Sequence, residues 1–165
     1  MSKQTLICTS VEEILKCIKN NKSFTICSVI TELSLAGNKI GDKGTKSLAD
    51  GFKHNGALIT LHLEINEIGD EGAKSLVDAF KDNSTLTILT LGGNDIRDDG
   101  VKSIGNALKE NRTLTTLNLG DNQIGDEGAK LLGNALKENS TLTILNLGDN
   151  QIRNEGAKSL ADALK

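Results

Sequence analysis

The chain has 165 residues and a formal net charge of −3, and 37% of its residues are hydrophobic and 25% charged. A chain of this length forms one domain, which buries roughly 70% of the surface that the unfolded chain exposes. The net negative charge disfavours nucleic acids and anionic membranes as partners, because no basic excess neutralises phosphate groups. The only aromatic residues are Phe24, Phe52 and Phe80, so base stacking and aromatic binding hot spots are nearly excluded.

Residues 1–29 differ from the rest of the chain and are expected to form an N-terminal capping segment. An extended run over 5–9 precedes Ser10 and Glu13, whose spacing is that of a helix capping box. One apolar face at helical spacing follows, made of Val11, Ile14, Leu15 and Ile18. The junction with the first strand of the repeats is expected to be sealed by Phe24, Ile26 and Val29.

This segment also holds all three cysteines of the chain. Cys8, Cys17 and Cys27 lack the Cys-x-x-Cys spacing of a zinc or redox pair, so we expect buried thiols. Acidic residues at Glu12 and Glu13 interrupt the segment, and no apolar run is long enough for a signal peptide or a membrane span. We therefore expect a protein that stays in the cytoplasm, or one delivered into a host cell if it is a bacterial effector.

Residues 30–165 repeat a unit of 28 residues without insertion or deletion. An asparagine marks each unit at the same place, namely Asn38, Asn66, Asn94, Asn122 and Asn150. So strict a period predicts a solenoid, in which each repeat contacts only its neighbours. The five expected repeats are 30–55, 56–83, 84–111, 112–139 and 140–165.

Each repeat is predicted to contain a strand of about three to five residues followed by a helix. Leucines two residues apart, such as Leu117 and Leu119, point to the same side of an extended chain and are buried together. Helix N-caps are predicted at Asp42, Asp70, Asp98, Asp126 and Asn154. The helices are predicted to end in a left-handed conformation at Asn55, Asn83, Asn111 and Asn139.

The segment LTTLNLGDNQI at 114–124 resembles the leucine-rich repeat signature L-x-x-L-x-L-x-x-N-x-I/L, and LTILNLGDNQI at 142–152 matches it equally well. The period and the helical half GDEGAKLLGNALKEN are similar to the ribonuclease-inhibitor-like subclass, found in NOD-like receptor sensor domains and the Ran GTPase-activating protein. The resemblance implies an α/β solenoid shaped as a short horseshoe, with a parallel sheet on its concave side and helices on its convex side. It also implies a ladder of buried asparagines that bond neighbouring backbone, carried here by Asn38, Asn66, Asn94, Asn122 and Asn150.

The concave face is the candidate partner-binding surface. With strands spaced about 4.8 Å apart and a rise of about 3.3 Å per residue along each strand, this face has an area of roughly 400 Å². That is about half of the area that one partner buries in a standard interface. The candidate residues flank the buried leucines and are Glu32, Ser34, Thr60, His62, Glu64, Ile65, Ile88, Thr90, Thr116, Asn118, Asp121, Ile144, Asn146 and Asp149. His62, Glu64 and Ile65 depart from the later repeats and are candidates for a binding spot, although ordinary sequence drift is the default explanation.

The sequence shows no catalytic, metal-binding or cofactor-binding constellation. The histidines lack metal-ligand neighbours at useful spacing, the cysteines lack a partner base, and the glycine-rich turns lack the P-loop pattern. Two rows of lysines recur along the helices and are interpreted as a solvated convex surface. The sequence therefore favours a non-enzymatic protein-interaction scaffold or ligand-recognition module that binds a protein, and neither nucleic acid nor membrane.

Two alternative functions remain open. Similarity to the Ran activator suggests a regulator of a GTPase, for which the candidate residues are Arg97, Arg112 and Arg153. Similarity to the tropomodulin C-terminal domain suggests a cytoskeletal capping module. The last repeat stops at Leu164 and Lys165 without a polar cap, so either the native chain continues or two copies form a homodimer through this end.

Overall fold

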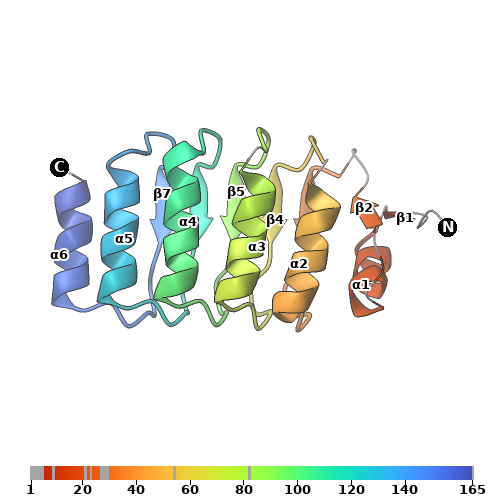
Figure 1. The fold of residues 1–165 in the computed structure, drawn as a ribbon, viewed down its shortest axis with the longest axis horizontal. Coiled ribbons are helices and arrows are strands. Elements are labelled where there is room, and N and C mark those ends of the chain that lie inside the picture. Colours follow the sequence, from red (N-terminus) through yellow and green to blue (C-terminus); the bar gives the residue numbers. More distant parts are fainter. Residues whose placement is uncertain are drawn as a thin grey trace.

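The computed structural model describes residues 6–8 (backbone only), 10–20, 22, 24–26, 30–53, 55–81 and 83–164. As predicted, the chain forms an α/β solenoid in which helices lie side by side along one face of a parallel sheet (Figure 1). The strands of the sheet are β3 (Glu32–Ser34), β4 (Thr60–His62), β5 (Ile88–Thr90), β6 (Thr116–Asn118) and β7 (Ile144–Asn146). The helices that follow them are α2 (Gly41–Phe52), α3 (Asp70–Phe80), α4 (Asp98–Glu110), α5 (Asp126–Leu136) and α6 (Asn154–Ala163).

The sheet keeps the strand order β3-β4-β5-β6-β7, which is the order of the strands along the chain. Each strand pairs with the next in a register of one full repeat, so that Leu61 lies opposite Leu33 and Leu89. The leucines on the helix side of the first four strands are buried, whereas Leu145 and Leu147 of the last repeat are only half-buried. The cause is that the N-terminal cap packs against the first repeat, whereas within the described residues no further repeat packs against the last one.

The N-terminal cap contains β1 (Leu6–Cys8), α1 (Val11–Lys19) and β2 (Phe24–Ile26). The N-cap predicted at Ser10 is confirmed, since its Oγ accepts a hydrogen bond of 3.3 Å from the Glu13 amide. Strands β1 and β2 pair in parallel as a separate two-stranded sheet. Phe24 and Ile26 are buried, in keeping with their predicted role, whereas Val29 lies outside the described residues.

The cysteines and the ends of the predicted extended run can be followed only in part. Cys17 is buried, as expected. The side chain of Cys8 and all of Cys27 lie outside the described residues, as do Thr5 and Thr9. No helix in the described part of the chain is long and apolar enough to cross a membrane.

The recurrent asparagines connect each repeat to the preceding one. The Asn66 Oδ1 atom accepts a hydrogen bond of 2.9 Å from the Asn38 amide, and its Nδ2 donates to the Leu35 carbonyl at 2.9 Å. Equivalent bonds from Nδ2 to the carbonyl of the preceding repeat recur at Asn94, Asn122 and Asn150. Asn66, Asn94 and Asn122 are buried as expected, whereas Asn150 is half-buried and Asn38 is exposed. The Nδ2 atom of Asn38 bonds carbonyls of its own turn.

The prediction that the aspartates cap their own helices is wrong. Asp70, Asp98, Asp126 and Asn154 are the first residues of their helices, Asp42 is the second of α2, and none of these helices has a side-chain bond from its N-cap. Instead, each aspartate accepts hydrogen bonds from backbone amides of the next repeat. The Asp42 Oδ1 atom accepts from the amides of Gly69 at 2.7 Å and Gly72 at 3.0 Å, at the start of α3.

The same bond is repeated along the solenoid. Asp70 bonds the Arg97 amide at 2.8 Å, Asp98 bonds the Gly125 amide at 2.7 Å, and Asp126 bonds the Arg153 amide at 2.7 Å. This arrangement explains the glycine in the first turn of α3, α4, α5 and α6: a Cβ on Gly72, for example, would lie 2.6 Å from the Asp42 Oδ1 atom. Helix capping therefore acts between repeats and fixes their spacing.

The prediction that asparagines end the helices in a left-handed conformation is also wrong. None of Asn55, Asn83, Asn111 and Asn139 has a positive φ angle. Instead, their side chains accept hydrogen bonds from the loop that follows. The Asn83 Oδ1 atom, for example, accepts from the Thr85 amide at 2.9 Å and the Leu86 amide at 2.8 Å, and its Nδ2 donates to the Asn55 carbonyl at 3.1 Å. A second asparagine ladder thus satisfies the loops that lead into the strands.

Candidate functional site

The open face of the sheet presents four rows of residues that run across the strands. The first row is Glu32, Thr60, Ile88, Thr116 and Ile144. The second row is Ser34, His62, Thr90, Asn118 and Asn146. The third row, just beyond the strands, is Ala36, Glu64, Gly92, Gly120 and Gly148, and the fourth is Gly37, Ile65, Gly93, Asp121 and Asp149. Every candidate residue predicted from the sequence lies in one of these rows.

His62 is the centre of a polar cluster that joins three strands. Its Nδ1 atom lies 3.0 Å from the Thr90 Oγ1 atom on β5 and 3.5 Å from a Glu64 carboxylate oxygen. Its Nε2 atom lies 3.8 Å from the Glu32 Oε1 atom on β3. The structure thus brings together the first two of the three departures found in the sequence, with Glu32 and Thr90 added from the neighbouring repeats.

One oxygen in this cluster lacks a hydrogen-bond donor. The Glu64 side chain is 28% exposed overall, but its Oε2 atom is buried and has no partner in the described part of the chain. A buried acceptor without a donor destabilises a fold by roughly 1–3 kcal/mol. The third row is otherwise made of alanine and glycine, so Glu64 is its only large side chain.

Ile65 has an unfavourable backbone conformation. Its φ angle is 56°, in the left-handed region that β-branched residues rarely adopt. The other members of its row have the same conformation but are glycine or aspartate, which tolerate it better. The Ile65 side chain is 67% exposed, so burial inside this molecule does not offset the strain. Gly93 makes room for it, since a Cβ there would lie 3.0 Å from Ile65 Cγ1.

The charges on the four rows have one sign. The acidic residues are Glu32, Glu64, Asp121 and Asp149, and the rows contain no lysine or arginine. Apolar side chains lie between these charges, with Ile88 half-buried and Ile144 58% exposed. The concave face is therefore acidic and carries isolated apolar side chains. Its charge is complementary to that of a basic partner surface.

Two polar contacts on this face could have been found from the sequence but were missed. The Oδ1 atoms of Asn118 and Asn146 accept from the amides of Gly120 and Gly148, both at 2.9 Å, so each asparagine also holds its own turn. The recurring Asn-Leu-Gly sequence was the available signal.

Threonines before the strands form a third ladder. The Thr115 hydroxyl donates to the Thr87 carbonyl at 3.2 Å, and the Thr143 hydroxyl donates to the Thr115 carbonyl at 3.2 Å.

The arginines proposed for a GTPase regulator do not converge. Arg97 immediately precedes α4, whereas Arg112 follows its end, so the two lie about 20 Å apart along a helix of 13 residues. The Arg112 guanidinium donates to the carbonyls of Lys109 and Asn111 at 2.7 and 3.1 Å. Arg153 immediately precedes α6, two repeats further along the chain than Arg97.

In the described residues, no group of three or more His, Cys, Asp or Glu side chains could hold a metal ion.

Comparison with known proteins places this geometry in a family. Five segments match the model of the leucine-rich repeat, at residues 27–49, 54–77, 82–105, 110–133 and 138–161. A search of curated proteins gives no match. The fold is similar to leiomodin-1 actin-binding site 2, with 25% sequence identity and a TM-score of 0.74 over 95% of this chain and 89% of that chain.

A second similar structure is the tropomodulin C-terminal domain from Caenorhabditis elegans. The sequence identity is 14% and the TM-score 0.73, over 94% of this chain and 92% of that chain. At this identity the likeness shows the fold alone. The five matched segments together span more than half of the sequence. This chain belongs to the leucine-rich repeat family.

Proposed function

We propose that this chain is a protein-interaction module that binds its partner on the concave face, anchored at a patch formed by His62, Glu64 and Ile65. The observation that carries this proposal is the exposed Ile65 side chain on a left-handed backbone. Such a conformation costs about 1–3 kcal/mol and persists mainly at functional positions. An apolar pocket on a partner would offset this cost, because burying an isoleucine stabilises by about 1.5–3 kcal/mol.

The surroundings of Ile65 support the same patch. The Glu64 Oε2 atom lacks a donor within the described residues, and a lysine or arginine of a partner would supply one. The four acidic residues of the rows would attract the same type of surface. We therefore propose a partner with a basic surface that carries an apolar side chain, and binding that weakens as salt increases.

The test compares proteins captured from a cell lysate by the immobilised chain and its variants, quantified by mass spectrometry. Ile65→Gly removes the apolar anchor and relieves the strain, and His62→Ala/Glu64→Ala removes the polar part of the patch. Glu67→Gly is the matched control, because Glu67 lies in the same turn with a φ angle of 59° but outside the four rows. The partner is expected to be lost from both patch variants and retained by the control; an identical set from all four proteins overturns the proposal.

A second candidate function is actin binding. It is favoured by the likeness to leiomodin-1 actin-binding site 2, which reaches 25% identity and spans 89% of that chain. Co-sedimentation with actin filaments and titration of labelled actin monomers test this function. Binding that disappears in the Ile65→Gly variant would identify actin as the concave partner, and no binding in either assay rejects this candidate. No observation in the structure favours the GTPase regulator.

A further inference from the structure

A groove of about 1180 Å³ is lined by residues of the capping helix α1, of the turn before α2 and of α2 itself. Figure 1 shows α1 and α2 next to one another at the N-terminal end of the row of helices. Its apolar residues are Leu15 and Ile18 from α1 and Ile40 from the turn before α2. The position of Ile18 depends on Gly44, since a Cβ on Gly44 would lie 2.8 Å from Ile18 Cγ2. The groove therefore has an apolar floor that is held between the two helices.

The groove is lined by four lysines and one acidic residue. The lysines are Lys19, Lys39, Lys43 and Lys46, and the acidic residue is Asp50. Among the described residues, none of these lysines forms an ion pair, whereas convex lysines elsewhere do: Lys81 with Glu110 at 3.0 Å and Lys109 with Glu138 at 2.8 Å. The groove thus has an excess of positive charge that the described part of the molecule leaves uncompensated.

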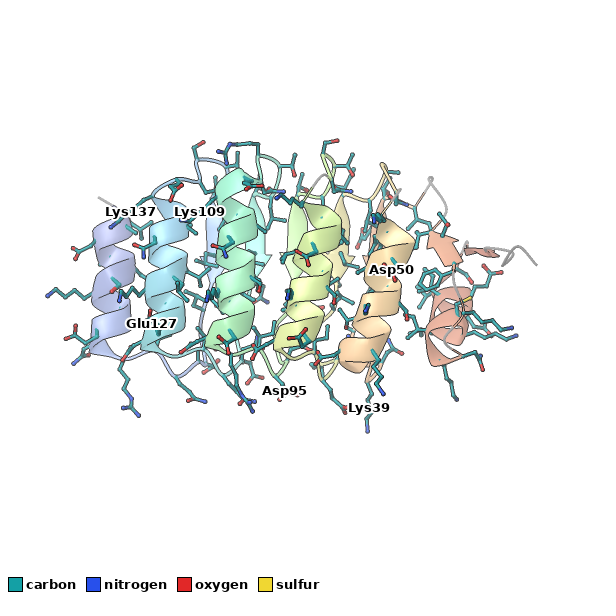
Figure 2. All side chains as sticks on the ribbon, in the orientation of Figure 1. Lys39, Asp50, Asp95, Lys109, Glu127 and Lys137 are labelled. Atoms are coloured by element: carbon teal, nitrogen blue, oxygen red, sulfur yellow. The ribbon has the colours of Figure 1, made fainter. Side chains whose placement is uncertain are left out.

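Two of these lysines reverse the charge pattern of the repeat. Lys39 takes the position that is acidic or an amide in the later repeats, namely Glu67, Asp95, Gln123 and Gln151. Lys43 takes a position that is acidic in every later repeat, namely Glu71, Asp99, Glu127 and Glu155. Figure 2 shows Lys39 and its counterpart Asp95 along the same edge of the solenoid. The packing of the repeat therefore does not require lysine at either position, and both substitutions place positive charge at the groove.

We infer that the groove between α1 and α2 binds an acidic amphipathic helix of a partner protein. Apolar side chains of that helix contact Leu15, Ile18 and Ile40, and its carboxylates pair with the lysines of the groove. This is the helix-in-groove mode, in which side chains at i, i+3, i+4 and i+7 supply the contacts. The volume exceeds the roughly 300–1,000 Å³ of small-molecule pockets, and the apolar floor does not suit a phosphate group. This surface is separate from the concave face and does not depend on the function proposed for that face.

The direct probe is a fluorescein-labelled synthetic helix of about 18 residues, with leucines on one face and glutamates flanking them. A second peptide has glutamine in place of every glutamate. Fluorescence anisotropy is expected to show saturable binding of the acidic peptide, at least about tenfold weaker binding of the neutral peptide, and weakening with salt. Absence of binding by the acidic peptide at millimolar protein, or equal binding of both peptides, overturns the inference.

The matching variant of the chain is Lys39→Asp/Lys43→Glu, which introduces residues already present at these positions in later repeats. Its control is Lys102→Glu/Lys158→Glu, which makes the same change in net charge on exposed helix positions outside the groove. The groove variant is expected to lower the affinity about tenfold, which corresponds to about 1.4 kcal/mol, and the control less than twofold. Equal losses in the two variants would show non-specific charge attraction and overturn the inference.

Methyl NMR identifies the face that the peptide occupies without any substitution. The acidic peptide is expected to shift the methyl signals of Leu15, Ile18 and Ile40 and to leave those of Ile88 and Ile144 on the concave face unchanged. Shifts confined to the concave isoleucines would place the peptide on the other surface and contradict the assignment of the groove.

Discussion

The second and fourth repeats have the same backbone and the same ladder but different exposed faces. In the fourth repeat Asn118 bonds the amide of Gly120, so its side chain holds its own turn. In the second repeat His62 replaces this asparagine and contacts Glu32, Glu64 and Thr90 instead. The two repeats therefore share the buried ladder, whereas on the open face the second repeat has a cluster of polar side chains from three strands in place of an asparagine that bonds its own turn.

The largest expected effect concerns the ladder that the two repeats share. Asn66→Ala and Asn122→Ala each remove a buried side chain that bonds backbone of two repeats. Each substitution leaves several buried groups unpaired and is expected to lower the free energy of unfolding by about 3 kcal/mol, measured by urea denaturation. Asn38→Ala, at the exposed end of the ladder, is the control and is expected to cost less than about 1 kcal/mol. Equal effects at all three positions would show that the ladder does not carry this stability.

A smaller effect is expected for the carboxylates that cap the next helix. Asp42 caps α3 in the second repeat, and Asp98 caps α5 in the fourth repeat. Replacing either by alanine is expected to lower the free energy of unfolding by about 1–2 kcal/mol, as for other helix caps. Asn154→Ala in α6 is the control and is expected to be nearly neutral. A large loss at Asn154 would contradict capping between repeats.

The sequence was sufficient to predict the solenoid, the strand and helix of each repeat and the residues of the concave face, because all of them follow from a strict period. It was misleading where a bond crosses from one repeat to the next. Asp42 lies where a cap of its own helix is expected, but its partners are Gly69 and Gly72 of the following repeat. The conformation of Ile65 was also out of reach, since isoleucine gives no indication of a left-handed backbone.

Among single substitutions, Ile65→Gly is expected to show the difference in backbone strain between the second and fourth repeats most clearly. It is expected to raise the free energy of unfolding by about 1 kcal/mol, because relief of strain exceeds the entropy cost of glycine. The equivalent Asp121→Gly in the fourth repeat is expected to change it by only a few tenths, because aspartate tolerates the left-handed region. A loss of stability in the Ile65→Gly variant would show that the side chain stabilises the fold.

The smallest expected effect concerns self-association through the C-terminal end. The outer edge of β7 has no pairing strand within the described residues, and Ile144 and Leu164 are 58% and 76% exposed. We propose that two copies meet weakly at this end. Analytical ultracentrifugation over a wide concentration range is expected to show a reversible dimer that Leu164→Glu weakens. A strictly monomeric species throughout would reject the dimer.

The most direct test of the concave patch gives the second repeat the residues of the fourth, as His62→Asn/Glu64→Gly/Ile65→Asp. Each new residue already occupies the equivalent position at Asn118, Gly120 and Asp121, so the repeat itself predicts that the backbone accepts them. Urea denaturation is paired with capture of partner proteins by the same samples. We expect a free energy of unfolding equal to or above that of the unmodified chain, together with loss of the partner. A lower free energy of unfolding, or a partner that remains bound, would contradict this expectation.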